Sequence, residues 1–239
     1  MLLLTGFLSF FNSIAYAAEP ELSILGKTIT QEKQQKMTPK QALQRLKEGN
    51  QRFLTNKQIT RDYLKQAHLS SFGQYPFAVV LNCMDSRSVP ELFLDQGLAD
   101  LFTLRVAGNV LNDDILGSME FATKVVGSRL IVVLAHTSCG AVSGSCEGAK
   151  LGHLTDVLDK IQPAVQVAMK EDNSKNCADP KLIDSIAKAN ALHVVREIQE
   201  KSPILRDLVK SKQVGIVAGL HDIKTGKVTF FEEERSVPS

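Results

Sequence analysis

Residues 82–87 (NCMDSR) place a cysteine, an aspartate and an arginine at alternating positions. In an extended chain alternate side chains share one face, so Cys83, Asp85 and Arg87 would converge there. Arg87 would keep Asp85 ionised, because a nearby cation lowers the pKa of a carboxylate. The carboxylate could then accept a hydrogen bond from a metal-bound hydroxide, or it could bind the metal itself and close the site.

A histidine and a second cysteine lie three apart in residues 136–140 (HTSCG). This spacing brings both side chains to one side where a strand gives way to a turn or a helix start. A helix that begins near Gly140 would also favour the thiolate form of Cys139. Two cysteines and one histidine suit tetrahedral zinc, and three protein ligands leave the fourth position open to water. We therefore predict that Cys83, His136 and Cys139 bind one Zn²⁺ per chain in a catalytic site.

Each of these residues also has an ordinary structural interpretation. A lone cysteine is most often buried as a small apolar residue, and a lone histidine is more often structural than a ligand. Asp85 and Arg87 could form a structural ion pair, since such pairs also occur away from catalytic sites. A non-enzymatic alternative is a redox module in which Cys83 and Cys139 form a disulfide and no metal binds.

Both segments follow short apolar runs that are typical of strands buried on two faces. The runs span residues 77–81, 101–106, 130–135 and 214–220. Stretches with helical spacing of apolar residues separate them, so we predict an α/β fold with a mainly parallel central β-sheet flanked by helices. Residues 228–231, after a Thr225-Gly226 turn, are predicted as an antiparallel edge strand. In such sheets the working site lies beyond the carboxyl ends of the strands, where both segments are found.

Helix start and stop signals divide the rest of this domain. Thr38 can cap a helix that has Pro39 at its first position and continues to about residue 57. Asp113 or Asp114 can cap a second helix, and Gly127 supplies its end. Further helices are predicted at residues 154–161, with a break or kink near Pro163, from Pro180 to residue 198, and from Pro203.

The N-terminal 36 residues are predicted to lie outside the folded domain. Residues 1–18 (MLLLTGFLSFFNSIAYAA) carry no charge and end on a small-x-small pattern, which is typical of a secretory signal cleaved after Ala17 or Ala18. The stretch is short and interrupted for a membrane span, although an anchor is the alternative. Residues 19–36 are polar and without periodicity, so we interpret them as a linker or loosely held arm before a domain at 37–239. We expect a periplasmic or secreted protein without stable membrane insertion.

The composition is that of an ordinary globular protein with a substantial core. The chain has 239 residues, of which 44% are hydrophobic and 23% charged. A net charge of +2 without a basic stripe argues against nucleic acid as a partner, and a small, weakly charged substrate fits better. Four cysteines are too few for a disulfide-built scaffold. Cys146 and Cys177 could pair in an oxidising compartment, but free thiols are the preferred interpretation.

Five motifs, in this order, resemble those of the β-class carbonic anhydrases. They are CMDSR at 83–87, RVAGN at 105–109, SMEFA at 118–122, HTSCGAV at 136–142 and GHL at 152–154, and the resemblance covers about residues 38 to 231. It implies that Cys83, His136 and Cys139 hold zinc, and that Asp85 and Arg87 form a catalytic dyad. Val106 departs from the asparagine that many members carry, which leaves the metal ligands intact.

The resemblance implies reversible hydration of carbon dioxide to bicarbonate and a proton by a homodimer or homotetramer, with zinc-bound hydroxide as the nucleophile. Two thiolates cancel the formal charge of the metal, so the metal should polarise its bound water less than in a three-histidine site. Asp85 and Arg87 then become more important for holding the hydroxide. We therefore expect activity to rise with pH above neutrality. A related zinc hydrolase of carbon disulfide or carbonyl sulfide would share these ligands. The candidates for a proton relay are His68, His153, His193 and His221, and His153 lies in a family motif.

Overall fold

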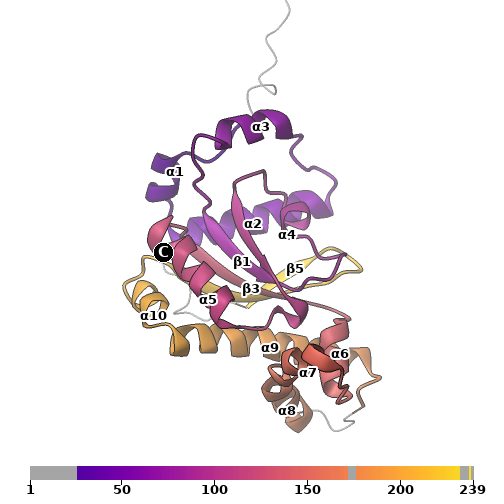
Figure 1. Ribbon diagram of the computed structural model, residues 1–239. Helices are drawn as coiled ribbons and strands as arrows, with labels where there is room; N and C mark the ends of the chain where they lie inside the picture. The colour runs from indigo at the N-terminus through magenta and orange to yellow at the C-terminus, as the bar shows by residue number, and fades with distance from the viewer. Residues whose placement is uncertain (1–25, 172–175, 232–236, 238–239) are drawn as a thin grey trace, which may run out of the picture.

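A five-stranded β-sheet forms the centre of the molecule (Figure 1). The computed structural model describes residues 26–171, 176–231 and 237. The strands are β1 (Ala78–Asn82), β2 (Leu101–Arg105), β3 (Leu130–His136), β4 (Gly215–His221) and β5 (Val228–Phe231), and their order in the sheet is β2-β1-β3-β4-β5. The first four strands are parallel and β5 is antiparallel to β4. The predicted fold class is confirmed.

Helices cover both faces of this sheet (Figure 1). They are α1 (Gln31–Lys36), α2 (Pro39–Leu54), α3 (Tyr63–Ser70), α4 (Pro90–Phe93), α5 (Asp113–Glu120), α6 (Gly140–Cys146), α7 (Gly152–Asp159), α8 (Gln162–Glu171), α9 (Pro180–Lys201) and α10 (Pro203–Lys210). A 3₁₀ turn lies at Ala107–Asn109, and a π-helical turn at Phe121–Val125 continues α5. No helix within the described ranges is long and apolar enough to cross a membrane.

The two faces of the sheet pack into two separate layers of core. Along β1, Val79 and Leu81 lie in the larger layer together with α5, α6, α8, α9 and α10. Ala78 and Val80 point to the opposite face, where α2 and α4 cover them. Successive side chains of a strand alternate between faces, so a strand that is covered on both sides must be apolar throughout. This explains the uninterrupted apolar runs in the sequence.

The predicted helix starts are largely confirmed. The Thr38 side chain accepts a hydrogen bond from the Gln41 backbone amide, and the Gln41 side chain returns one to the Thr38 amide, which completes a capping box. The cap of α5 is Asn112, one residue before the predicted aspartates, and it accepts from the Ile115 amide. The predicted break near Pro163 separates α7 from α8.

The linker predicted at residues 19–36 is wrong for its described part, which begins at Gly26. Ile29 is buried in the core beside α2. Gln34 is also buried and donates a side-chain hydrogen bond to the Pro76 carbonyl oxygen at 2.8 Å. Arg129 also donates to the carbonyl oxygens of Gln34 and Gln35, at 3.2 and 2.8 Å. These contacts hold the six-residue helix α1 and the residues before it, but they give no periodic pattern in the sequence. The predicted signal segment, residues 1–18, lies outside the described residues.

Cys146 and Cys177 form a disulfide bond, so the preference for free thiols was wrong. The bond joins the end of α6 to the turn before α9, with 31 residues of sequence separation and 5.7 Å between the Cα atoms. Helices α7 and α8 lie in the loop that it closes (lower right in Figure 1). Because these helices fold back and bring two distant cysteines together, the spacing in the sequence does not reveal the pair.

Candidate metal centre

The site is built where two neighbouring parallel strands end. β1 ends at Asn82 and β3 ends at His136, and Asn82 is in register with Leu134, two residues before that histidine. Cys83 follows β1 directly. The chain after β3 turns within three residues and enters α6, whose N-cap is Cys139. The predicted position beyond the carboxyl ends of the strands is therefore the observed one.

The side chains of Cys83, His136 and Cys139 converge, and their ligand atoms all lie within 4.8 Å of one another. The two sulfur atoms are 4.0 Å apart, and all three residues are buried, at 4%, 0% and 1% exposure. Tetrahedral zinc with Zn–S bonds of about 2.3 Å places two sulfurs about 3.8 Å apart. The observed spacing fits this ion with little adjustment.

The imidazole of His136 is oriented for a metal. Its Nδ1 lies 2.9 Å from the Thr137 carbonyl oxygen, to which the ring can donate. Its Nε2 is buried and has no hydrogen-bond partner among the described residues. Metal-binding histidines characteristically donate one ring N–H to a carbonyl or carboxylate and leave the other nitrogen for the ion. The orphaned Nε2 and the sulfur-rich donor set therefore fit zinc.

The two thiols differ in their tendency to ionise. The contact with Cys139 and, after it, those with His136 and nearby backbone amides lower the pKa of Cys83 to about 4, against the opposing effect of burial. The contact with the Cys83 thiolate and burial raise the pKa of Cys139. Two buried sulfurs in contact resist carrying two negative charges, whereas a divalent cation between them stabilises both thiolates.

Asp85 and Arg87 form a two-pronged ion pair beside this cluster. Arg87 donates through Nε and Nη2 to the Asp85 carboxylate at 3.0 and 2.7 Å, and its backbone amide donates at 2.9 Å. These hydrogen bonds hold the pKa of Asp85 well below its usual range. Asp85 Oδ2 is 3.8 Å from His136 Nε2, so the carboxylate faces the cluster. The chain turns at residues 86–87, so the pair meets through a turn and not, as predicted, through an extended strand.

Arg105, at the end of β2, fixes the backbone of the first segment. Its Nε donates to the Cys83 carbonyl oxygen at 3.2 Å and its Nη2 to the Asp85 carbonyl oxygen at 2.6 Å. The guanidinium thus holds the residues on both sides of Met84 in place. Sequence reasoning did not assign this role. Its position at a strand end, within the RVAGN motif, was the available signal.

Gly108 and Asn190 support the Cys83 sulfur from the other side. The Gly108 amide donates to Cys83 Sγ at 3.3 Å, and the Gly108 carbonyl accepts from Asn190 Nδ2 at 2.8 Å. Gly108 has a φ of 65°, and a Cβ there would lie 2.6 Å from Ile161 Cδ1, so the position requires glycine. Asn190 is fully buried on α9. It therefore orients the peptide that donates to the predicted ligand, and sequence reasoning missed it.

The turn between β3 and α6 is held by α9 and β4. The Ser138 amide, in a residue with a φ of 53°, donates to Asp184 Oδ1 at 2.9 Å. The Thr137 amide donates to the His221 carbonyl oxygen at 2.9 Å. These bonds fix the residues between His136 and Cys139, so the separation of the two ligands does not depend on a flexible loop.

The predicted relay histidines lie in different surroundings. His153 projects fully into solvent from α7, and His68 packs edge-on against Phe72. His221 is buried, stacks on Phe93 at 3.9 Å and has its Nδ1 3.0 Å from Ser88 Oγ. Burial and, after it, the charge of the neighbouring His136 lower the pKa of His221 to about 4.

The central part of the chain, residues 78–228, matches the family model described as carbonic anhydrase. The chain belongs to the β-carbonic anhydrases. Carbonic anhydrase 2 of Mycobacterium tuberculosis is 31% identical over 196 residues, covering 79% of this chain and 91% of that protein. A carbonic anhydrase of Mycolicibacterium smegmatis is 32% identical over 197 residues, covering 80% and 92%. The resemblance seen in the five motifs is confirmed.

Solved β-carbonic anhydrases share the fold of this family member. The β-carbonic anhydrase CcaA gives a TM-score of 0.66 at 23% identity, over 82% of this chain and 92% of that one. Structures of two tetrameric β-carbonic anhydrases from the ascomycete Sordaria macrospora give a TM-score of 0.64 at 19% identity, over 70% and 86%. The parallel sheet that positions the metal centre is thus the family's own framework.

Proposed function

We propose that this β-carbonic anhydrase catalyses the reversible hydration of carbon dioxide to bicarbonate and a proton, with one Zn²⁺ held by Cys83, His136 and Cys139. One observation carries the proposal: three buried ligand atoms within 4.8 Å of one another, with an ionised carboxylate beside them. Zinc bound there would act as a Lewis acid that lowers the pKa of a water molecule toward neutrality. Three protein ligands leave one position for that water.

Asp85 and Arg87 supply the polar groups next to the attacking water. The Asp85 carboxylate is ionised throughout the neutral pH range, so it can accept a hydrogen bond from this water and direct an oxygen lone pair at the carbon of carbon dioxide. Arg87 holds both carboxylate oxygens and thereby fixes the carboxylate's orientation. One proton of the water would pass to solvent before the new C–O bond forms, and the product would leave as bicarbonate.

The test combines carbon dioxide hydration by stopped flow with measurement of zinc content. The variants are Cys83→Ser and, as a matched control, Met84→Ser, whose side chain is 63% exposed beside the cluster. We expect about one zinc per chain and rapid hydration in the wild type and control, and loss of both in Cys83→Ser. A wild-type protein without zinc, or one with zinc but without hydration, would contradict the proposal. Faster hydrolysis of carbonyl sulfide or carbon disulfide would reassign the substrate.

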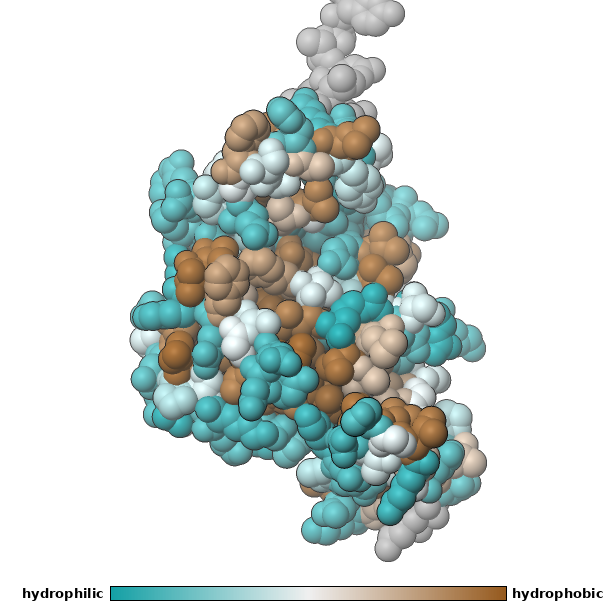
Figure 2. Space-filling view, in the orientation of Figure 1, coloured by the Kyte–Doolittle hydropathy of each residue, from teal (hydrophilic) through white to brown (hydrophobic). Residues whose placement is uncertain are grey.

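A homodimer or homotetramer is proposed to form at the β2 edge of the sheet. β2 is one of the two edge strands; its first four residues are partly buried and Arg105 is exposed. A hollow beside it is lined by Phe102, Leu104 and Phe121, with Asp113 and Asp114 at the start of α5, and Figure 2 shows apolar side chains gathered on this face. Phe121 is 51% exposed. A second copy of the chain would cover these side chains and the open strand edge, and the Sordaria proteins of the same fold are described as tetrameric.

Sedimentation equilibrium would test the assembly. We expect Phe121→Asp to shift the protein toward monomer, since a charge in a buried interface is costly. Val167→Asp, on α8, introduces the same charge at another exposed apolar position and should leave the assembly unchanged. A wild-type monomer, or equal behaviour of the two variants, would contradict the proposal.

A periplasmic or secreted location is proposed on two grounds. Residues 1–18 have the composition of a cleaved secretory signal. The disulfide between Cys146 and Cys177 suits an oxidising compartment, since such bonds are rare in a reducing cytosol. Cell fractionation with N-terminal sequencing would test this, and we expect a mature chain that begins after Ala17 or Ala18. An intact N-terminus in the cytosolic fraction would contradict it.

A further inference from the structure

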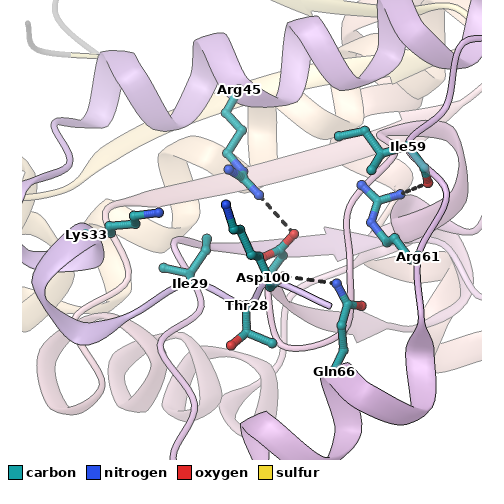
Figure 3. Close-up of a pocket in the computed structure, with 9 residues that line it drawn as sticks. Thr28, Ile29, Lys33, Arg45, Ile59, Arg61, Gln66 and Asp100 are labelled. Carbon is teal, nitrogen blue, oxygen red and sulfur yellow. Dashed lines mark hydrogen bonds and ion pairs between the residues drawn. The ribbon is translucent and has the colours of Figure 1, made fainter. Parts of the chain in front are cut away.

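A cavity lies at the opposite ends of the strands from the metal centre. Asp100 precedes β2, so it marks the amino ends of the strands, and it lines a cavity of about 200 Å³. Four basic side chains line the same cavity: Lys27, Lys33, Arg45 and Arg61 (Figure 3). Asp100 is the single carboxylate among the lining residues, and the protein as a whole has a net charge of only +2.

The nearby carboxylates are already engaged with arginines. Asp100 Oδ2 accepts from Arg45 Nη2 at 3.0 Å and from the Gly97 amide at 2.8 Å. Arg61 pairs with Asp95, which is 2% exposed at its side chain and also accepts from Arg52 at 2.5 Å. Neither carboxylate is therefore available to neutralise another cation that enters or lines the cavity.

The two lysines carry the uncompensated charge. Within the described parts of the chain, Lys27 and Lys33 have no ion pair or hydrogen bond through their ammonium groups. Figure 3 shows Lys33 and Arg45 reaching into the cavity from different elements, α1 and α2. Ile29 and Ile59 form apolar parts of the wall. Apolar walls lower the local dielectric, so a concave site lined by like charges concentrates a field that attracts counter-ions.

We propose that this cavity binds a small divalent oxyanion of the phosphate or sulfate type. The ammonium groups of Lys27 and Lys33 would donate to it, and Arg45 would add its charge from α2. The anion would thereby link the N-terminal segment at 27–33 to the helix that packs on the sheet. The proposed anion site is separate from the metal centre and from carbon dioxide hydration. Either the anion proposal or the catalytic proposal can therefore fail without the other.

Thermal unfolding of the purified zinc-loaded protein would test this proposal. Sodium phosphate or sulfate is titrated against sodium chloride at constant ionic strength. The variant Lys27→Gln/Lys33→Gln removes the two free donors, and Lys40→Gln/Lys57→Gln removes the same charge from exposed lysines outside the cavity. Both pairs are exposed, so folding should be unaffected, which circular dichroism and the hydration rate would verify.

We expect 50 mM phosphate or sulfate to raise the unfolding midpoint by about 5–9 °C in the wild type and in Lys40→Gln/Lys57→Gln, for a dissociation constant of about 1 mM. The rise should saturate, and Lys27→Gln/Lys33→Gln should lose it. An equal rise in all three proteins would show a general salt effect and overturn the proposal. Phosphorus-31 NMR of added phosphate, with the wild type and with Lys27→Gln/Lys33→Gln, gives a second measurement, and identical line broadening in the two would also overturn the proposal.

Discussion

Replacement of Asn190 by leucine tests whether the predicted zinc ligands depend on support from α9. Asn190 Nδ2 donates to the Gly108 carbonyl at 2.8 Å, and the Gly108 amide donates to Cys83 Sγ at 3.3 Å. Leucine has a similar size and shape, so Asn190→Leu removes the hydrogen bond without opening a large cavity. The Gly108 carbonyl then loses its hydrogen bond from α9, and the peptide can rotate away from the Cys83 sulfur.

The size of the effect follows from which atoms lose partners. The Gly108 carbonyl becomes a buried acceptor without a donor, which costs about 1–3 kcal/mol. Asn190 Oδ1 has no partner among the described residues, so its removal costs nothing and offsets part of this penalty. We expect the free energy of unfolding to fall by about 1 kcal/mol. The loss at the metal should be larger, since removal of a supporting hydrogen bond typically weakens metal binding by about 10–100-fold.

The assay is competition for zinc with a chromophoric chelator, together with the sulfur-to-metal charge-transfer band after cobalt substitution. The control is Gln199→Leu, the same kind of change on α9 at a side chain that donates a hydrogen bond to the Val195 carbonyl. We expect weaker zinc binding and a shifted cobalt band in Asn190→Leu, and wild-type values in the control. A zinc affinity within twofold of the wild type, with an unchanged cobalt band, would show that Asn190 serves packing alone.

Three further predictions concern other contacts. Arg87→Gln should slow hydration by about 10–100-fold at unchanged zinc content, because the Asp85 carboxylate loses the two side-chain hydrogen bonds that orient it; an unchanged rate would contradict this. Cys146→Ser/Cys177→Ser should lower the free energy of unfolding in urea by about 3.7 kcal/mol for a loop of 31 residues, and equal stability would refute it. His221 stays neutral in the fold down to a pKa of about 4 while the unfolded chain is protonated below its usual pKa, so stability should fall as pH drops between these values. The slope, up to about 1.4 kcal/mol per pH unit, should be shallower in His221→Gln, and parallel curves would contradict this.

The position of the metal centre could be predicted from the sequence because it requires only that two strands are adjacent and parallel. Two apolar runs that form adjacent parallel strands necessarily end at the same edge, so residues directly after them must lie near one another. Cys83, His136 and Cys139 are such residues. Their meeting was therefore a consequence of fold class. The proximity of Asp85 to Arg87 was also predicted, but from an extended chain, and a turn produces it instead.

The supporting contacts could not be predicted, because they join distant segments through backbone groups. Asn190 acts on Cys83 through the peptide of Gly108, and nothing in the residue types of α9 marks that contact. The disulfide depends on how two intervening helices fold back. The short helix α1 and the residues before it are fixed by Ile29, Gln34 and hydrogen bonds from Arg129, and these residues form no periodic stripe. In each case tertiary packing, not local pattern, decides the outcome.

One cysteine pair of this chain forms a disulfide and the other pair is free, and the difference has a physical reason. Cys146 and Cys177 lie beside a turn and are bonded to each other. Cys83 and Cys139 are in contact at 4.0 Å, yet both are buried, and each is held by separate backbone contacts at the end of its own strand. His136 lies beside these two cysteines, and its Nε2 has no hydrogen-bond partner among the described residues. A disulfide would leave that nitrogen buried and unsatisfied, whereas a metal ion satisfies all three side chains at once.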